Sequence, residues 1–301
     1  MRTGLASTSI GCPLPQNNCM PKGWSWDPSL FEGSAAFYQR GRLPYPASLA
    51  PVLKATLSLD VSGRLLDVGC GPGTVALDVA HLFSEVVGVD ANSEMIVEAT
   101  RLAKSRRITN SRFLNLRAEA LSTDLGTFRV ATFAQSFHWM ERETVAAIIY
   151  TLLEPGGAFV HVDCAPEVRP PMEYLEPERP PMPDVPRDSI DRLIQSYLGP
   201  QRRAGRGVLL HGTPSGESEV VTGVGFGPPL TTFVGGGEWH VRSTDDLVAW
   251  VFAASGSAPH LFGTRLRNFE RDLRSLLAES SASGTYAQRA PFMQLRTWVK
   301  G

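Results

Sequence analysis

The sequence predicts an α/β fold, a doubly wound sheet of mostly parallel strands covered by helices, and two observations point to it. The first is the stretch LLDVGCGPG at 65–73, in which an apolar run ends in an acid and three glycines then alternate with other residues. The second is that apolar runs of strand length alternate with segments of helical apolar spacing along 61–163.

The stretch 65–73 is interpreted as a buried strand that runs into a tight turn and opens a helix. The turn has no side chains at Gly69, Gly71 and Gly73, so its backbone can lie directly against a ligand. The helix that follows offers unpaired N–H groups at its N-terminus, beside that ligand. A second apolar strand, 86–89, ends in Asp90, where an acid can hold a pair of ribose hydroxyls.

These features predict an adenosine-type cofactor and leave its identity open. Residues 71–76 also satisfy the G-x-G-x-x-G/A pattern of dinucleotide enzymes, which keeps a nicotinamide-dependent oxidoreductase as an alternative. Asp67 favours S-adenosylmethionine, because a carboxylate just before the glycines would repel a pyrophosphate. It would suit an ammonium group, or a water beside one, and S-adenosylmethionine has an ammonium and no phosphate.

The other predicted elements follow from apolar spacing and turn residues. A helix over 93–103 is expected to begin at a cap formed by Asn92 or Ser93. Further strands are predicted at 112–116, 130–135, 158–162, 231–241 and 292–299, and further helices at 141–153 and 190–198, with two more between the last two strands.

Five motifs, in this order, resemble the class I S-adenosylmethionine-dependent methyltransferases, in the small-molecule branch related to trans-aconitate and ubiquinone/menaquinone methyltransferases. They are YQRGRLPYP (38–46), DVGCGPG (67–73), EVVGVDANSEMI (85–96), AQSFHWM (134–140) and LLEPGG (152–157). The resemblance implies a Rossmann-like sheet with an antiparallel seventh strand. It also implies S-adenosylmethionine as cofactor and S-adenosylhomocysteine as product.

The resemblance further implies which residues hold the cofactor. Tyr38 and Arg42 would reach the methionine carboxylate from a helical flap, although simple packing of this segment is the alternative. Met95 would lie on the adenine face, unless it is only core, and Glu119 would accept a hydrogen bond from the adenine amino group. The remaining cofactor-binding residues implied are Asp67, Gly69, Cys70, Gly71, Gly73, Asp90, Ala91, Ala118 and Gln135.

His138 is the candidate catalytic base, because it directly follows the fourth strand, at the carboxyl edge of the sheet. A histidine has a reference pKa of about 6.5, which suits it to accept a hydroxyl proton. The alternative is that His138 only packs and that catalysis is by proximity. His161 and Asp163, which share one face of the fifth strand, are the reserve candidates. Trp24, Trp26, Trp139 and Asp163 are the expected substrate contacts.

Five segments are predicted. They are a tail at 1–23, a helical flap at 24–60, the cofactor-binding core at 61–163, a Pro/Gly-rich inserted cap at 164–229, and the C-terminal part of the core sheet with two helices at 230–301. The cap would cover the substrate, because ligands bind at the carboxyl edge of such sheets.

Composition narrows the class of partner. The net charge of −1 over 301 residues gives no electrostatic reason to expect nucleic acid or a membrane surface. No apolar run approaches the roughly 20 residues that span a bilayer, and a cytoplasmic location is expected. The four cysteines lack metal-ligand spacing, so no metal is predicted. A monomer or a homodimer is expected, with a small molecule as partner.

The sequence therefore predicts a methyltransferase that acts on a small or medium metabolite, and O-methylation with His138 as base is the leading hypothesis. The alternatives are a non-methylating reaction with the same cofactor, N- or C-methylation by proximity, and a non-enzymatic adenosine sensor.

Overall fold

The computed structural model describes residues 27–164, 174–209, 212–213 and 215–301, and these form two compact units. The first unit holds the described residues of 1–42, 178–214 and 239–289. The second holds those of 43–177, 215–238 and 290–301. The predicted tail at 1–23 lies outside the described residues.

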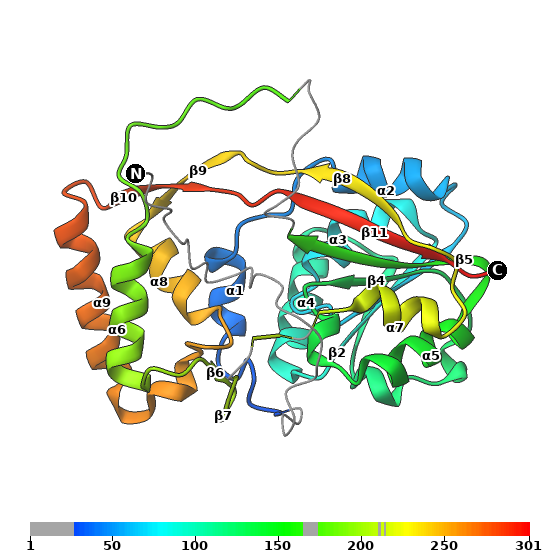
Figure 1. The fold of residues 1–301 in the computed structure, drawn as a ribbon, viewed down its shortest axis with the longest axis horizontal. Helices are drawn as coiled ribbons and strands as arrows, with labels where there is room; N and C mark the ends of the chain where they lie inside the picture. The colour runs from blue at the N-terminus through cyan, green and yellow to red at the C-terminus, as the bar shows by residue number, and fades with distance from the viewer. Residues whose placement is uncertain (1–26, 165–173, 210–211, 214) are drawn as a thin grey trace, which may run out of the picture. The chain divides into compact units, whose positions relative to one another are not determined.

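The second unit is built on a seven-stranded sheet in the order β3-β2-β1-β4-β5-β11-β8 (Figure 1). Its strands are β1 (Arg64–Val68), β2 (Glu85–Asp90), β3 (Ser111–Asn115), β4 (Phe128–Ala134), β5 (Leu153–Cys164), β8 (Leu230–Gly235) and β11 (Met293–Val299). The strands β1 to β5 are parallel, and β11 runs antiparallel to both of its neighbours, β5 and β8. The doubly wound sheet with an antiparallel last strand is therefore confirmed.

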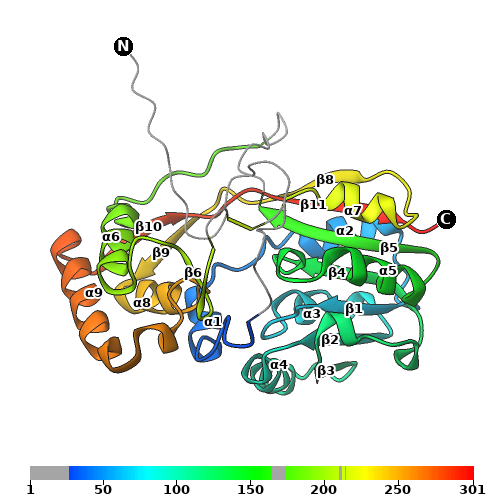
Figure 2. The ribbon, with the colours of Figure 1, turned by 60° about the horizontal axis from the view of Figure 1, so that its bottom comes forward.

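Helices cover this sheet on both faces, as Figure 2 also shows. They are α2 (Leu49–Leu57), α3 (Thr74–Val79) with the 3-10 turn η1 (Ala80–Leu82), α4 (Ser93–Ser105), α5 (Arg142–Leu152) and α7 (Glu217–Gly223). Alternation along β1 explains the two cores. Leu65 is buried with α2 and α3, whereas Leu66 and Val68 are buried with α5 and α7.

The predicted strand at 231–241 is wrong as a single element. The structure divides it into β8 and β9 (Trp239–Ser243), and β9 leaves the large sheet to pair with β10 (Thr285–Arg289). The physical reason is the run Gly235, Gly236 and Gly237, whose φ angles of 143°, 114° and 85° interrupt the strand in a conformation that favours glycine.

The first unit joins segments that are far apart in the sequence. Its helices are α1 (Ala35–Gly41), α6 (Arg187–Leu198), α8 (Thr244–Phe252) and α9 (Leu266–Ser280), with the 3-10 segment η5 (Pro259–Arg265) and the short strands β6 (Arg203–Ala204) and β7 (Gly207–Val208). Phe252, Phe262 and Phe269 are central to its core, and the rings of Phe262 and Phe269 stack with centroids 3.9 Å apart. The predicted boundary at 229/230 does not separate the two units, since α6, α8 and α9 lie in one of them.

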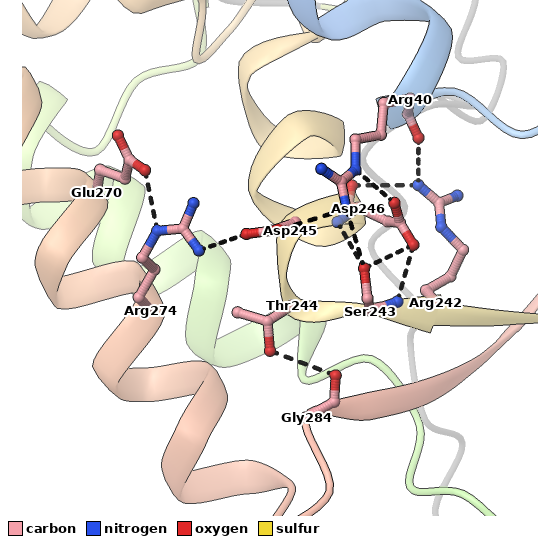
Figure 3. A network of polar contacts seen from close by, with 9 residues as sticks. All are labelled: Arg40, Arg242, Ser243, Thr244, Asp245, Asp246, Glu270, Arg274 and Gly284. Carbon is pink, nitrogen blue, oxygen red and sulfur yellow. Dashed lines mark hydrogen bonds and ion pairs between the residues drawn. The ribbon is translucent and has the colours of Figure 1, made fainter.

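A polar network fixes α1 against the start of α8 (Figure 3). The buried Arg242 donates from Nη2 to the carbonyl oxygens of Arg40, Gly41 and Asp246. Arg40 in turn pairs with Asp246 at 2.7 Å. Ser243 and Asp246 form a reciprocal capping box at the start of α8. The last turn of α1 thus obtains the hydrogen-bond donors that a helix C-terminus lacks.

Within the described ranges, every helix is too short or too polar to cross a bilayer.

Candidate functional site

The glycine turn after β1 has the predicted geometry. Gly69, Gly71 and Gly73 have φ angles of 68°, 53° and 79°, which side chains disfavour, and Gly73 is the N-cap of α3. A Cβ on Gly69 would lie 2.5 Å from Ser136 Cβ, whereas a Cβ on Gly71 would meet no atom within 4 Å. The backbone at Gly71 therefore borders open space, where a ligand can approach it.

Asp90 organises this turn from the end of β2. Its carboxylate accepts hydrogen bonds from the N–H groups of Gly71 and Asn92, both at 2.8 Å. Burial raises the pKa of Asp90, although these two bonds act to lower it. Asn92 caps α4 by accepting from the N–H groups of Glu94 and Met95, as predicted. Ala91 lies between Asp90 and Asn92 in the sequence, and the side chain of Met95 is buried.

Asp67 lies inside β1, only 1% exposed. Its Oδ1 accepts a hydrogen bond from Thr132 Oγ1 at 2.7 Å, and a hydrogen bond from the N–H of Ala76 also acts to lower the pKa of this carboxyl. Burial raises the pKa of Asp67 to about 6, and the charge of Asp90 acts in the same direction. Burial also raises the pKa of the nearby Cys70 thiol. This half of the site is therefore short of positive charge.

Glu119 lies at the expected turn after β3, in the 3-10 segment η2 (Ala118–Ala120), where Ala118 is buried. One carboxylate oxygen accepts from the N–H of Glu141 at 3.0 Å, and the other pairs with Arg117 Nε at 3.2 Å. Arg117 thus holds the carboxylate from its own loop.

The end of β4 carries Gln135 and, in the 3-10 turn η4 (Phe137–Trp139), His138. Gln135 adopts a left-handed backbone with φ 57°, which is strained for a residue with a Cβ. Ser136 Oγ donates to the carbonyl of Val68 at 2.6 Å and so ties this loop to β1. His138 is half-buried, and its ring lies 4.8 Å from that of Trp139.

Near the carboxyl end of β5, the side chains of His161 and Asp163 both contact the guanidinium of Arg296 from β11. Arg296 Nη2 lies 3.1 Å from His161 Nδ1, 3.3 Å from Asp163 Oδ2 and 3.2 Å from Glu217 Oε2 of α7. Gln135 Nε2 donates to Asp163 Oδ1 at 2.9 Å, which links the ends of β4 and β5.

Sequence reasoning missed Arg296 and Glu217. The one available signal was a cation in the middle of the strand MQLRTWV, at 293–299, where Leu295 and Trp298 are buried.

The other predicted residues belong to the first unit or lie outside the described residues. Tyr38 is in α1, and Arg42 directly follows this helix. The Arg42 guanidinium lies 5.1 Å from the centre of the Tyr38 ring, and its Nη2 donates to the carbonyl of Ala253 at 2.9 Å. Trp24 and Trp26 are among those that the structure does not describe. The flap, cap and substrate roles stay predictions.

Among the described side chains, no group of three or more His, Cys, Asp or Glu residues is arranged to hold a metal ion.

Comparison with known proteins bears on the same segment. Residues 65–157 match the methyltransferase domain family. A Saccharomyces cerevisiae protein named as a probable S-adenosylmethionine-dependent methyltransferase is 30% identical over 128 residues, which are 42% of this chain and 43% of the relative. A ubiquinone biosynthesis O-methyltransferase of Albidiferax ferrireducens is 32% identical over 96 residues, 31% of this chain and 38% of the relative. The chain thus spans less than half the length of these relatives.

Among solved structures, the fold is similar to that of a Haemonchus contortus phosphoethanolamine N-methyltransferase, which was solved with phosphomonomethylethanolamine and S-adenosylhomocysteine. The TM-score is 0.50 at 14% identity, and the match covers 93% of this chain and 61% of that one. At this identity the likeness concerns the fold alone.

Proposed function

We propose that this chain, whose residues 65–157 match a methyltransferase domain, is a class I S-adenosylmethionine-dependent methyltransferase that binds S-adenosylmethionine and methylates a small or medium-sized metabolite. The observation that carries the proposal is the glycine turn. Gly71 borders open space, and Asp90 holds its N–H from the next strand. This arrangement leaves a backbone surface and an acid side by side, as recognition of an adenosine requires.

The residues present fit such a cofactor. Asp67 is a buried carboxyl, and the described groups that shift its pKa include no cation. An ammonium group, or a water that bridges to one, would compensate it. Asp90 would hold the ribose hydroxyls, and the buried Met95 and the Glu119 turn would border the adenine. Tyr38 and Arg42 remain the proposed contacts of the methionine carboxylate.

The sulfonium supplies an electrophilic methyl group when the cofactor is bound, so the protein must align the acceptor and take up any proton. For a hydroxyl acceptor, His138 is the proposed general base. It lies at the carboxyl end of β4, and it is only half-buried, so a substrate can reach it. Trp139, whose ring lies beside it, would border the acceptor. His161 is a poorer base, because burial lowers its pKa to about 4 and Arg296 contacts its Nδ1.

The test is methyl transfer from S-adenosylmethionine to a panel of hydroxylated compounds, with His138→Ala and His81→Ala compared. His81 is an exposed histidine of η1 and serves as the matched control. We expect transfer to fall by about 10²- to 10⁴-fold in His138→Ala, the usual contribution of a general base, and to persist in His81→Ala. Full activity of His138→Ala would favour catalysis by proximity. Cofactor binding without methylation of any hydroxylated compound would favour N- or C-methylation or a non-methylating reaction.

A further inference from the structure

The cluster at the carboxyl end of β5 and in the middle of β11 is short of positive charge. Two carboxylates, Asp163 and Glu217, share the single guanidinium of Arg296, and both contacts use its Nη2. His161 adds no charge near neutral pH, because burial and Arg296 lower its pKa to about 4. Two carboxylates of the cluster thus face one guanidinium.

The neighbouring elements do not supply the missing cation within the described ranges. Arg142 of α5 is a second guanidinium near α7, and it donates to the carbonyl of Ser215 at 2.7 Å instead of pairing with Glu217. Gln294, which lies opposite Asp163 in the β11 register, is uncharged. Burial raises the pKa of Asp163, although Arg296 and Gln135 act to lower it. Compensation of the two carboxylates is therefore incomplete.

Of the two carboxylates, Asp163 is the one that a ligand can reach. Its side chain is 31% exposed, against 12% for Glu217 and 19% for Arg296. It is also held in place, because Gln135 and Arg296 each contact one of its oxygens. A fixed, half-exposed carboxylate attracts a nearby cation through its charge. For an ammonium, charge-assisted hydrogen bonds add to this attraction, whereas a sulfonium has no hydrogen-bond donor.

We infer that Asp163, oriented by Arg296 and Gln135, binds a positively charged group of a small molecule at the carboxyl edge of the sheet. The inference rests on the proposed function for the source of that group. It is either an ammonium on the methyl acceptor or the sulfonium of the cofactor. Arg296 is a positioning residue in this arrangement, and Glu217 supplies the excess charge.

Binding measurements on Asp163→Asn distinguish the sources at pH 7. For an acceptor, the probes are 2-phenylethylamine and its neutral analogue 2-phenylethanol, titrated by NMR into protein saturated with S-adenosylhomocysteine. For the cofactor, the ligands are S-adenosylmethionine, S-adenosylhomocysteine, which lacks the sulfonium charge, and 5′-methylthioadenosine, which lacks the ammonium as well. Asp124→Asn, an exposed acid of η3 (Thr123–Leu125), is the matched control.

An acceptor site predicts that the wild type prefers the amine over the alcohol by about tenfold, and that Asp163→Asn abolishes the preference. A sulfonium site predicts a loss of about tenfold for S-adenosylmethionine alone. A loss for both amino-acid-bearing ligands and not for 5′-methylthioadenosine would instead place Asp163 on the cofactor ammonium and would contradict the assignment of that group to Asp67. Glu217→Gln removes the excess charge without altering Asp163 and should weaken the same ligand, which keeps the test valid if Asp163→Asn does not fold.

The inference is overturned if both variants leave every one of these affinities unchanged. Failure of the proposed function looks different, because then the wild type itself would bind none of the three adenosine ligands.

Discussion

Replacing Asp67 by asparagine should remove a pH dependence of stability that this one buried carboxyl imposes. Its pKa rises from an ordinary value of 3.8 to about 6 in the folded chain, chiefly through burial. Between these two values the folded state retains a proton that the unfolded state has lost. Stability therefore falls as pH rises through this window, by about 3 kcal/mol in total, at roughly 1.36 kcal/mol per pH unit.

The substitution Asp67→Asn is nearly isosteric. In the variant, Thr132 Oγ1 can still donate to the carbonyl oxygen of the amide, as it does to Oδ1 of Asp67 at 2.7 Å. The amide nitrogen would replace Oδ2. A buried amide without a partner costs about 1–3 kcal/mol, and this cost does not vary with pH. The difference between the two proteins thus isolates the carboxyl.

The assay is urea unfolding of both proteins at several pH values from about 4.5 to 7.5. About 2 kcal/mol of the effect develops in this range, so the wild type should lose that much stability relative to Asp67→Asn as pH rises. Parallel stability curves would refute the reasoning, because they would mean that Asp67 titrates normally in the folded chain.

Three further predictions concern other buried contacts. The pKa of His161 is lowered to about 4 in the folded chain, so the wild type should gain roughly 3 kcal/mol of stability as pH rises from about 4 to 6.5. His161→Gln should remove this gain, whereas Asp67→Asn removes a loss, and the same urea series measures the difference. Gly41→Ala should destabilise the first unit by about 1–3 kcal/mol, because the new Cβ would clash with the carbonyl oxygen of Ala249; an unchanged thermal midpoint would contradict this. Ser243→Ala should cost about 1 kcal/mol through loss of the α8 cap, and Ser243→Gly less, as chemical denaturation can show.

The sequence was sufficient for the elements whose signal is local. The apolar run at Leu65 and the cap at Asn92 define their own strand and helix, and the structure confirms both. The glycine turn after β1 is equally local, because glycines at alternating positions allow backbone conformations that other residues disfavour.

The parts that depend on distant contacts could not be predicted. Arg296 lies 135 residues from His161 and 79 from Glu217, and only the register of β11 against β5 brings the three together. The first unit is similar in this respect. Arg242 lies 202 residues from Arg40 and 201 from Gly41, whose carbonyl groups it holds, and no periodicity reports such a pairing.

The most direct measurement for the central claim is calorimetric titration with S-adenosylmethionine and, separately, S-adenosylhomocysteine. It should be repeated on Asp90→Ala and on Asp78→Ala, where Asp78 is an exposed acid of α3 that pairs with Arg106. The account predicts micromolar binding of both ligands to the wild type and to Asp78→Ala, and loss of binding in Asp90→Ala. Absence of binding to the wild type would contradict it and would return the glycine turn to the dinucleotide alternative.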